Sequence, residues 1–290
     1  MPRPRSINFA MNSQSKVRRI PSPDSALDSR SSAAGSVLSL DRYVGHSMKK
    51  VKGFLTSLDA LTIQALLTYQ CEKSIRGDLC EIGVHHGRLF LMLALARRTG
   101  ERAIAIDLFE DDSYNANTDH AGRDTALFEN ARRLGIEFSE DEIFKTSSLD
   151  IGPSDILART TGPVRFFSVD GGHLYHHVEN DLRLAESTLA GEGVIAIDDF
   201  FNIGWVDVSF ATYDFLRQTS ALMPFAVTPK KLYLAPSAAA DNYKAALRKR
   251  TDFAHIERVE ILGSEVLALQ HGLLKRGYDA LRNSIARHAF

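Results

Sequence analysis

The chain has 290 residues, of which 44% are apolar, and a formal net charge of −1. This length allows a sizeable buried core, and the near-neutral charge argues against a protein that coats nucleic acid phosphates. No apolar run approaches the roughly 20 residues that a membrane-spanning helix needs. The two cysteines, Cys71 and Cys80, suggest no disulfide framework, so we expect a soluble cytoplasmic protein with no nucleic-acid or membrane partner.

The first part of the chain divides into a polar tail and a helical segment. Residues 1–40 are rich in Ser, Pro and Arg, which is typical of a disordered tail. Residues 41–77 are predicted to form an N-terminal helical cap, because apolar side chains recur at close to helical spacing from Leu61 to Leu67. The remaining residues, 78–290, are predicted to form one domain.

Short β-branched runs that alternate with helical segments predict a parallel sheet. Three such runs, 103–106, 166–169 and 194–197, each end directly before an aspartate. This alternation is typical of βαβ units with strands buried on both faces. The helix before the last run is predicted to end at Gly191. The predicted fold class is therefore α/β, a doubly wound Rossmann-like sheet with helices on both faces. Further strands are predicted at 79–82, 142–145, 225–227, 232–234, 259–262 and 266–269, and helices at 58–75, 89–96, 151–159 and 238–249.

Acidic residues gather where the predicted strands end, at the edge of an α/β sheet where ligands bind. One aspartate after a strand is explained as a turn residue or a helix cap. A whole set of acids at one edge is explained less well in this way, and it indicates a functional site. The set comprises Glu81, Asp107, Asp170, Asp198 and Asp199.

The loop after the first strand favours a nucleoside over a dinucleotide. Its glycines, Gly83 and Gly87, lack the middle glycine of the G-x-G-x-x-G pattern that lets backbone amides approach a pyrophosphate. This spacing disfavours a nicotinamide cofactor, whereas a nucleoside without phosphate tolerates the looser loop. Asp107 lies where a carboxylate could accept hydrogen bonds from both ribose hydroxyls.

Asp170, Asp198 and Asp199 form the sharper cluster, because adjacent strands would bring them to the same edge of the sheet. Two carboxylates about 4 Å apart repel by about 4 kcal/mol at an effective dielectric constant of 20. Three together therefore either take up protons or hold a cation. Oxygen ligands favour Mg²⁺, with Mn²⁺ or Ca²⁺ as alternatives, over zinc. A rival interpretation is that Asp199 merely caps the next helix.

Histidines offer a second rival site. His173, His176 and His177 have the spacing of metal ligands on a helix. The helix is predicted to begin near Tyr175, which leaves His173 in the loop and the other two on the first turn, so a zinc site is the less favoured interpretation. The single tryptophan, Trp205, either stacks on an acceptor or packs the start of the next helix.

Several of these motifs occur together in one known family. They are E-I-G-V-x-x-G-R from Glu81, the acid Asp107, D-G-x-H-x-Y-x-x-V-x-x-D-L from Asp170, and I-D-D-F from Ile197. Over roughly residues 50–235 the chain resembles class I S-adenosylmethionine-dependent methyltransferases. The branch it resembles is that of metal-assisted O-methyltransferases of the macrocin O-methyltransferase type, which modify sugar hydroxyls of natural products.

The resemblance implies a seven-stranded sheet, mostly parallel with the last strand antiparallel, and methyl transfer to a hydroxyl group. It implies that Asp170, Asp198 and Asp199 bind Mg²⁺ and that His173 is a general base, with Asp170 also at the catalytic centre. The implied residues for S-adenosylmethionine are Glu81, Gly83, Gly87, Asp107, Ser147, Ser148 and Asp170.

The sequence thus predicts a Mg²⁺-assisted, S-adenosylmethionine-dependent O-methyltransferase whose catalytic domain is residues 78–290. The expected acceptor is a small hydroxylated molecule, a sugar moiety first and a catechol-like diol second. Two alternatives stay open: a non-catalytic nucleoside-binding protein of the same fold, and a nicotinamide-dependent oxidoreductase. A homo-oligomer is compatible with the sequence.

Overall fold

The computed structural model describes residues 38–109, 124–219, 221–250 and 255–270. The tail that the sequence predicts to be disordered, 1–40, lies outside these ranges up to position 37. None of the helices in the described ranges is long and apolar enough to span a bilayer.

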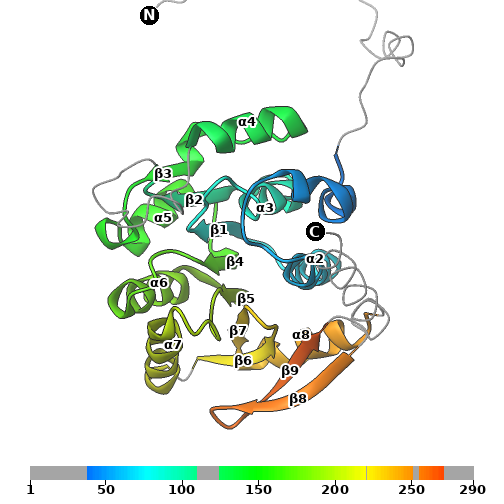
Figure 1. Ribbon diagram of the computed structural model, residues 1–290, viewed down its shortest axis with the longest axis vertical. Coiled ribbons are helices and arrows are strands. Elements are labelled where there is room, and N and C mark those ends of the chain that lie inside the picture. The colour runs from blue at the N-terminus through cyan, green and yellow to red at the C-terminus, as the bar shows by residue number, and fades with distance from the viewer. Residues whose placement is uncertain (1–37, 110–123, 220, 251–254, 271–290) are drawn as a thin grey trace, which may run out of the picture. The chain divides into compact units, whose positions relative to one another are not determined.

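Five parallel strands form the first half of the sheet, as the alternating pattern predicts. Strand β1 pairs with β2 on one side and with β4 on the other, and β4 also pairs with β5 (Figure 1). Successive side chains of a strand point to opposite faces, so Leu79 joins one apolar cluster and Cys80 the other. The strands are β1 (Asp78–Ile82), β2 (Ala103–Asp107), β3 (Ile143–Lys145), β4 (Val164–Val169) and β5 (Leu189–Ile197).

The second half of the sheet contains antiparallel strands. Strand β7 (Leu232–Pro236) is antiparallel to both β5 and β6 (Leu222–Val227), and β9 (Ser264–Gln270) joins β6 and forms a hairpin with β8 (His255–Ile261). The described sheet therefore has nine strands, in the order β3-β2-β1-β4-β5-β7-β6-β9-β8, where the sequence predicted seven. The two extra strands are the predicted C-terminal hairpin, which extends the sheet because β9 pairs with β6. The Rossmann-like α/β fold itself is confirmed.

Helices cover both faces of this sheet, as predicted (Figure 1). Helices α2, α3, α4 and α8 contribute to one apolar cluster, and α5, α6 and α7 contribute to the other. The helices are α1 (Leu40–Arg42), α2 (Ser57–Glu72), α3 (Phe90–Ala96), α4 (Asp124–Leu134), α5 (Pro153–Arg159), α6 (Tyr175–Thr188), α7 (Val206–Gln218) and α8 (Ser237–Arg248).

One predicted helix end is wrong. Helix α6 ends at Thr188 rather than at Gly191, and β5 begins at once, with Leu189 in an extended conformation. Leu189 already pairs with Val164 of β4. The sheet pairing therefore ends the helix, and Gly191 lies within the strand.

The N-terminal helices pack on the same core as the sheet. The described residues from Leu38 onward form one compact unit, and α2 buries Ile63, Leu66 and Leu67 in the apolar cluster of its face. The boundary predicted between residues 77 and 78 therefore separates segments that share a core.

Candidate active site

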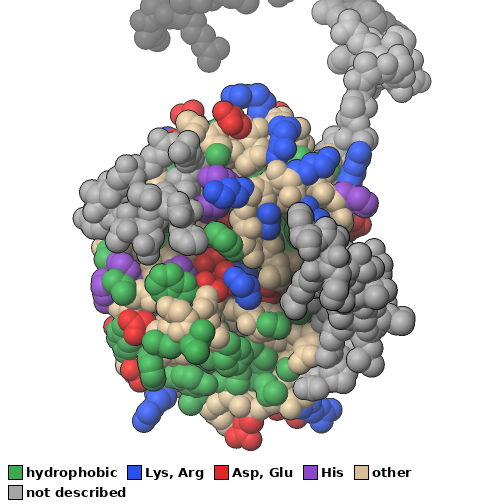
Figure 2. Space-filling model, viewed as in Figure 1, with side chains coloured by type: hydrophobic (Ala, Val, Ile, Leu, Met, Phe, Trp, Pro, Cys, Tyr) green, Lys and Arg blue, Asp and Glu red, His purple; other side chains and the backbone are tan. Residues whose placement is uncertain are grey.

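The parallel register brings the predicted acids together at the carboxyl edge of the sheet. Val169 of β4 pairs with Ile197 of β5, so Asp170 and Asp198, which follow them, are neighbours. Figure 2 shows acidic and basic side chains side by side in a hollow near the middle of the face in view, with an apolar area over α7. The acids that the sequence singled out thus share one site with cationic groups.

The pKa values of the neighbouring carboxyl groups of Asp170 and Asp198 shift in opposite directions. Burial and the negative charge of Asp198 raise the pKa of Asp170 well above its usual range. Burial also favours the neutral form of Asp198, but the Lys231 ammonium and a hydrogen bond from Asp170 outweigh it and lower the pKa of Asp198. Of the two carboxyl groups, Asp198 therefore ionises more readily and Asp170 holds its proton more tightly.

Lys231 is a site residue that the sequence analysis missed. Its Nζ lies 3.1 Å from Asp198 Oδ1 and 4.0 Å from Asp170 Oδ2, and the side chain is buried. Lys231 lies at the end of the turn between β6 and β7. Because β7 is antiparallel to β5 and Leu232 pairs with Ile197, Lys231 lies opposite Asp198.

Asp199 lies beside the catalytic candidate His173. Its Oδ2 is 3.4 Å from His173 Nε2, and its Oδ1 is 3.4 Å from Lys230 Nζ. Burial opposes ionisation, but His173, Asn202 and Lys230 outweigh it and hold the pKa of Asp199 well below its usual range. Asp199 has a φ of 52°, a left-handed conformation that is strained for aspartate. Such strain is typical of functional sites.

Aromatic stacking supports His173 from the other side. The rings of His173 and Trp205 stack with centroids 4.6 Å apart, and Trp205 immediately precedes α7. Helix α6 begins at Tyr175, as predicted, which leaves His173 in the loop. His176 and His177 lie on the first turn, in contact with each other.

A group that could hold a metal ion combines two of the three predicted ligands with His173. Asp170, His173 and Asp199 each offer one ligand atom, and these atoms lie within 4.8 Å of one another. Among the described residues, the buried Asp199 Oδ1 accepts no hydrogen bond, and its ion-pair partner Lys230 lies 3.4 Å away. Carboxylate oxygens of this kind fit a hard divalent cation. The third predicted ligand, Asp198, faces Lys231 instead.

The glycine loop is held tightly against the neighbouring strand end. Gly83 has a φ of 85°, and a Cβ at this position would lie 1.7 Å from the carbonyl oxygen of Asp170. Asp107 accepts hydrogen bonds from the backbone N–H groups of His85 (2.7 Å) and Phe109 (2.6 Å). The predicted ribose ligand Asp107 therefore also fixes the loop, through bonds that the sequence did not reveal.

A small hollow of about 40 Å³ lies between this loop and the acids. Glu81 is buried at its wall, and its Oε2 accepts no hydrogen bond within the described residues. Burial raises the pKa of Glu81 well above its usual range. An oriented, unsatisfied carboxyl group fits an amine of a ligand. The hollow is lined by Gly53, Phe54, Leu55, Glu81, Gly83, Val84, His85, Arg88, Leu89, Asp170 and Lys231.

Residues 51–55, which we call the strap, close this hollow. Arg88 donates hydrogen bonds to the carbonyl oxygens of Val51 (2.7 Å) and Leu55 (3.3 Å). The space left is far smaller than a nucleoside. Sequence reasoning did not predict this contact, which joins segments far apart in the chain.

The two serines predicted near the cofactor are differently placed. Ser147 caps a short 3₁₀ turn, and its hydroxyl accepts a hydrogen bond from the N–H of Leu149. Ser148 is buried and hydrogen-bonded to Asp181 on α6. Ser148 therefore supports the helix that follows the acidic loop.

A match to a family model decides the identity of the domain. Residues 80–200 match the model of a family described as a methyltransferase domain. The chain contains a methyltransferase domain. The match spans Glu81, the glycine loop and the acids up to Asp199, so the prediction of a methyltransferase is confirmed for this part of the chain. The macrocin-type branch stays a prediction.

The solved structure of one O-methyltransferase shares the fold at low sequence identity, and two further solved structures are similar with lower TM-scores. The O-methyltransferase NovP is 15% identical, with 62% of this chain and 81% of NovP covered and a TM-score of 0.52. CalS11, a TDP-rhamnose 3'-O-methyltransferase of calicheamicin biosynthesis, is 18% identical over 62% of this chain and 82% of its own (TM-score 0.44). An O-methyltransferase from Bacillus cereus in complex with SAH is 15% identical over 68% of this chain and 89% of its own (TM-score 0.46). No curated protein sequence matches the chain.

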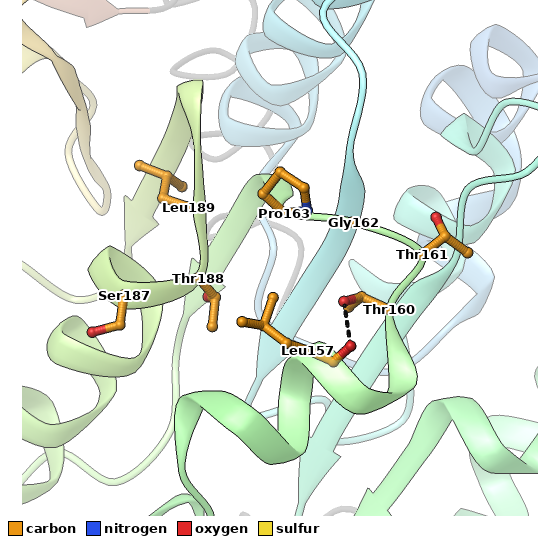
Figure 3. Close-up of a pocket in the computed structure, with 8 residues that line it drawn as sticks. All are labelled: Leu157, Thr160, Thr161, Gly162, Pro163, Ser187, Thr188 and Leu189. Atoms are coloured by element: carbon orange, nitrogen blue, oxygen red, sulfur yellow. Dashed lines mark hydrogen bonds between the residues drawn. The ribbon is translucent and has the colours of Figure 1, made fainter.

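A larger pocket of about 390 Å³ lies elsewhere on the methyltransferase domain (Figure 3). It is formed by Leu157 of α5, the loop 160–163, and the junction of α6 with β5 at Leu189. Pro163 precedes β4 and Leu189 begins β5, so this pocket lies at the amino ends of the strands. No ionisable side chain lines it, and it is remote from the acids.

Proposed function

We propose that the methyltransferase domain transfers a methyl group from S-adenosylmethionine to a hydroxyl of a small molecule, assisted by a divalent cation. The observation that carries the proposal is the cluster of Asp170, His173 and Asp199 beside the hollow walled by Glu81. An alcohol needs help to lose its proton at neutral pH. A cation site together with a base supplies this help.

The cofactor is proposed to bind across the glycine loop, with the strap displaced. Glu81 would hold the amine of the methionine moiety, Asp107 the ribose, and the Ser147–Ser148 turn would border the adenine. Gly83 and Gly87 keep the loop close to the strand ends. When bound, the cofactor supplies an electrophilic methyl group and leaves as a neutral thioether.

Asp170 and Asp199 are proposed to hold the cation, with water as the remaining ligands. Mg²⁺ is usually bound in proteins through one or two carboxylates and several waters, and Mn²⁺ or Ca²⁺ fit the same oxygens. A bound cation lowers the pKa of an oxygen that it coordinates. Asp198 was also predicted as a ligand, and its contact with Lys231 gives it a different partner.

His173 is proposed as the general base. The Trp205 ring and Asp199 hold its imidazole beside the site, and the imidazole would take up the acceptor's proton. A positioned base typically contributes about 10²–10⁴-fold in rate. The adjacent Asp199 carboxylate stabilises the imidazolium that results.

The acceptor is proposed to be a sugar moiety of a natural product or glycan, with a catechol-like diol as the second choice. Both present neighbouring hydroxyls, one of which can reach His173 while the other contacts Asp170 or Asp199. Beside the site, the surface exposes Phe201, Ile203, Val206 and Phe210, which can contact apolar parts of the acceptor.

We further propose a cytoplasmic protein that does not act on nucleic acid. Cys71 and Cys80 are both free thiols in the structure, which fits a reducing compartment. The chain's net charge of −1 offers no general attraction to phosphate backbones.

The test is methyl transfer from labelled S-adenosylmethionine to a panel of hydroxylated acceptors, with Mg²⁺ and with excess chelator. We expect product with Mg²⁺, and a loss of the Mg²⁺-dependent turnover in Asp199→Ala. Normal turnover of Asp199→Ala in chelator would contradict the cation-assisted reaction.

Two rival functions make different predictions. A ligand at about 100 times its Kd adds about 2.7 kcal/mol of stability, so thermal shift distinguishes them. Stabilisation by NAD but not by S-adenosylhomocysteine would indicate an oxidoreductase. Stabilisation by S-adenosylhomocysteine without product from any acceptor would indicate a non-catalytic binding protein.

A further inference from the structure

Lys231 is a buried cation in the middle of the acidic site. Its side chain is 2% exposed, and its ammonium lies 3.1 Å from Asp198 Oδ1 and 4.0 Å from Asp170 Oδ2. The neighbouring Lys230 is different, because its side chain is 35% exposed and reaches Asp199 from the rim. Burying an ammonium group is costly unless it is paired, so the site itself holds this lysine charged.

The fold fixes this ammonium in place. Lys231 immediately precedes β7, whose first residue Leu232 pairs with both Ile197 and Val227. Its backbone N–H donates to the Thr228 hydroxyl (2.8 Å), and the Thr228 hydroxyl donates to Asp59. The backbone of Lys231 is thus anchored between two strands, and its ammonium is buried against Asp198.

The position of Lys231 separates the three carboxylates into two sets. Asp198 faces the ammonium and lies outside the group of ligand atoms formed by Asp170, His173 and Asp199. Two cations a few ångströms apart repel strongly at low effective dielectric. Asp198 therefore cannot serve the ammonium and a divalent cation equally.

We propose that Lys231 is a built-in cation that occupies Asp198 and thereby limits the divalent metal site to Asp170 and Asp199, weakening its affinity for metal. This inference rests on the proposed cation site of the methyltransferase. Lys231 is a positioning residue in this proposal, since it acts through Asp198 and through its charge. If Lys231 were only a structural counter-ion, its removal would leave metal binding unchanged or weaken it.

The experiment measures the Kd of Mn²⁺ by isothermal titration calorimetry on the full chain without cofactor, with the free Mn²⁺ signal in electron paramagnetic resonance as a second readout. In Lys231→Met the repelling charge is lost and Asp198 becomes available. We expect Mn²⁺ to bind about tenfold tighter or better than in the wild type, a change of about 1.4 kcal/mol.

A double variant keeps the proposal testable if the single variant does not fold. In Lys231→Met/Asp198→Asn both charges are removed, a change that buried pairs often tolerate. The proposal expects its Mn²⁺ affinity to stay within about threefold of the wild type, because Asp170 and Asp199 remain. Lys231→Arg keeps the charge and is expected to lack the tenfold gain.

Lys244→Met is the matched control, since Lys244 is a buried, ion-paired lysine on α8. It should leave Mn²⁺ affinity unchanged. Unchanged or weaker Mn²⁺ binding in Lys231→Met would overturn the proposal, as would a tenfold loss in the double variant, which would make Asp198 a ligand. Absence of Mn²⁺ binding in every variant would also overturn it. The thermal shift with S-adenosylhomocysteine and the methyl-transfer assay are measured separately from Mn²⁺ binding. Failure of methyl transfer is therefore distinguishable from failure of this inference.

Discussion

At the scale of single residues, the loop that carries Asp170 and His173 depends on a buried carboxyl beneath it. Asp181 of α6 lies under Gly171, where a Cβ would come within 2.7 Å of Asp181 Oδ2. Asp181 Oδ2 has no hydrogen-bond partner among the described residues. Burial raises the pKa of Asp181 to about 6, although hydrogen bonds from Ser148 and Asn180 oppose the shift.

This raised pKa predicts a pH-dependent stability. The pKa of Asp181 is about 6 in the folded state and 3.8 as its ordinary value, so the folded state binds more protons between these values. Stability is therefore expected to fall as pH rises from about 4 to about 6, by about 3 kcal/mol at most. Asp181→Asn should remove this slope and be more stable than the wild type at pH 8, measured by urea unfolding. An unchanged slope in Asp181→Asn would show that other groups cause it.

Sequence reasoning at this scale identified the chemical groups better than their partners. Asp170, His173 and Asp199 were chosen from strand ends and a motif, and the structure brings them together. Lys231 was not singled out from the sequence, because its partner Asp198 lies more than thirty positions away. The identity of a carboxylate is local information, whereas its counter-ion depends on strand order.

At the scale of secondary-structure elements, the strap covers the hollow beside Glu81. Its backbone carbonyls at Val51 and Leu55 are held by one side chain, Arg88, which follows the glycine loop. Tyr43 in turn donates a hydrogen bond from its hydroxyl to the Arg88 carbonyl oxygen (2.7 Å). These hydrogen bonds link Arg88, after the glycine loop, both to the strap and to Tyr43, which lies earlier in the chain.

The strap predicts a local change in hydrogen exchange. Arg88→Ala removes two charge-assisted hydrogen bonds, each typically worth about 1.5–3 kcal/mol. Amides of residues 51–56 should then exchange at least about tenfold faster in the free protein, as measured by mass spectrometry, while amides of β4 stay unchanged. Arg88→Lys should give an intermediate rate, because it retains one cationic donor. Equal rates in the wild type and in Arg88→Ala would mean that other contacts hold the strap.

At the scale of the whole molecule, a buried polar network joins the N-terminal helices to the sheet. Arg165 of β4 is 1% exposed. It pairs with Glu101 (2.9 Å) and donates to Gln70 of α2 (2.8 Å) and to the Ala96 carbonyl oxygen of α3 (2.9 Å). Gln70 also donates to the Tyr243 hydroxyl of α8 (3.0 Å). The predicted cap and the predicted catalytic domain therefore share a network as well as an apolar core.

This network predicts cooperative unfolding of the cap with the sheet. Arg165→Met leaves Glu101 with Arg98 as its cationic partner and removes the guanidinium that donates to Gln70. Breaking a buried pair by removing one partner typically costs about 3–5 kcal/mol, and the remaining Arg98 contact puts the expected loss at the low end. The free energy of unfolding should fall by about 3 kcal/mol, with far-UV and near-UV circular dichroism reporting one transition. Two separated transitions would show that residues 41–77 unfold independently, as the predicted boundary at residue 78 would allow.

The sequence by itself determined the elements and most chemical groups of this protein. Periodicity, turn residues and strand-end acids are local signals. The amino-acid sequence therefore predicted the parallel strands, the start of α6 and the acids Asp170 and Asp199. Tertiary structure decided the pairing of β9 with β6, the end of α6 at Thr188 and the contact of Lys231 with Asp198. These features depend on which strands lie side by side and in which register, and residues distant in sequence set that arrangement.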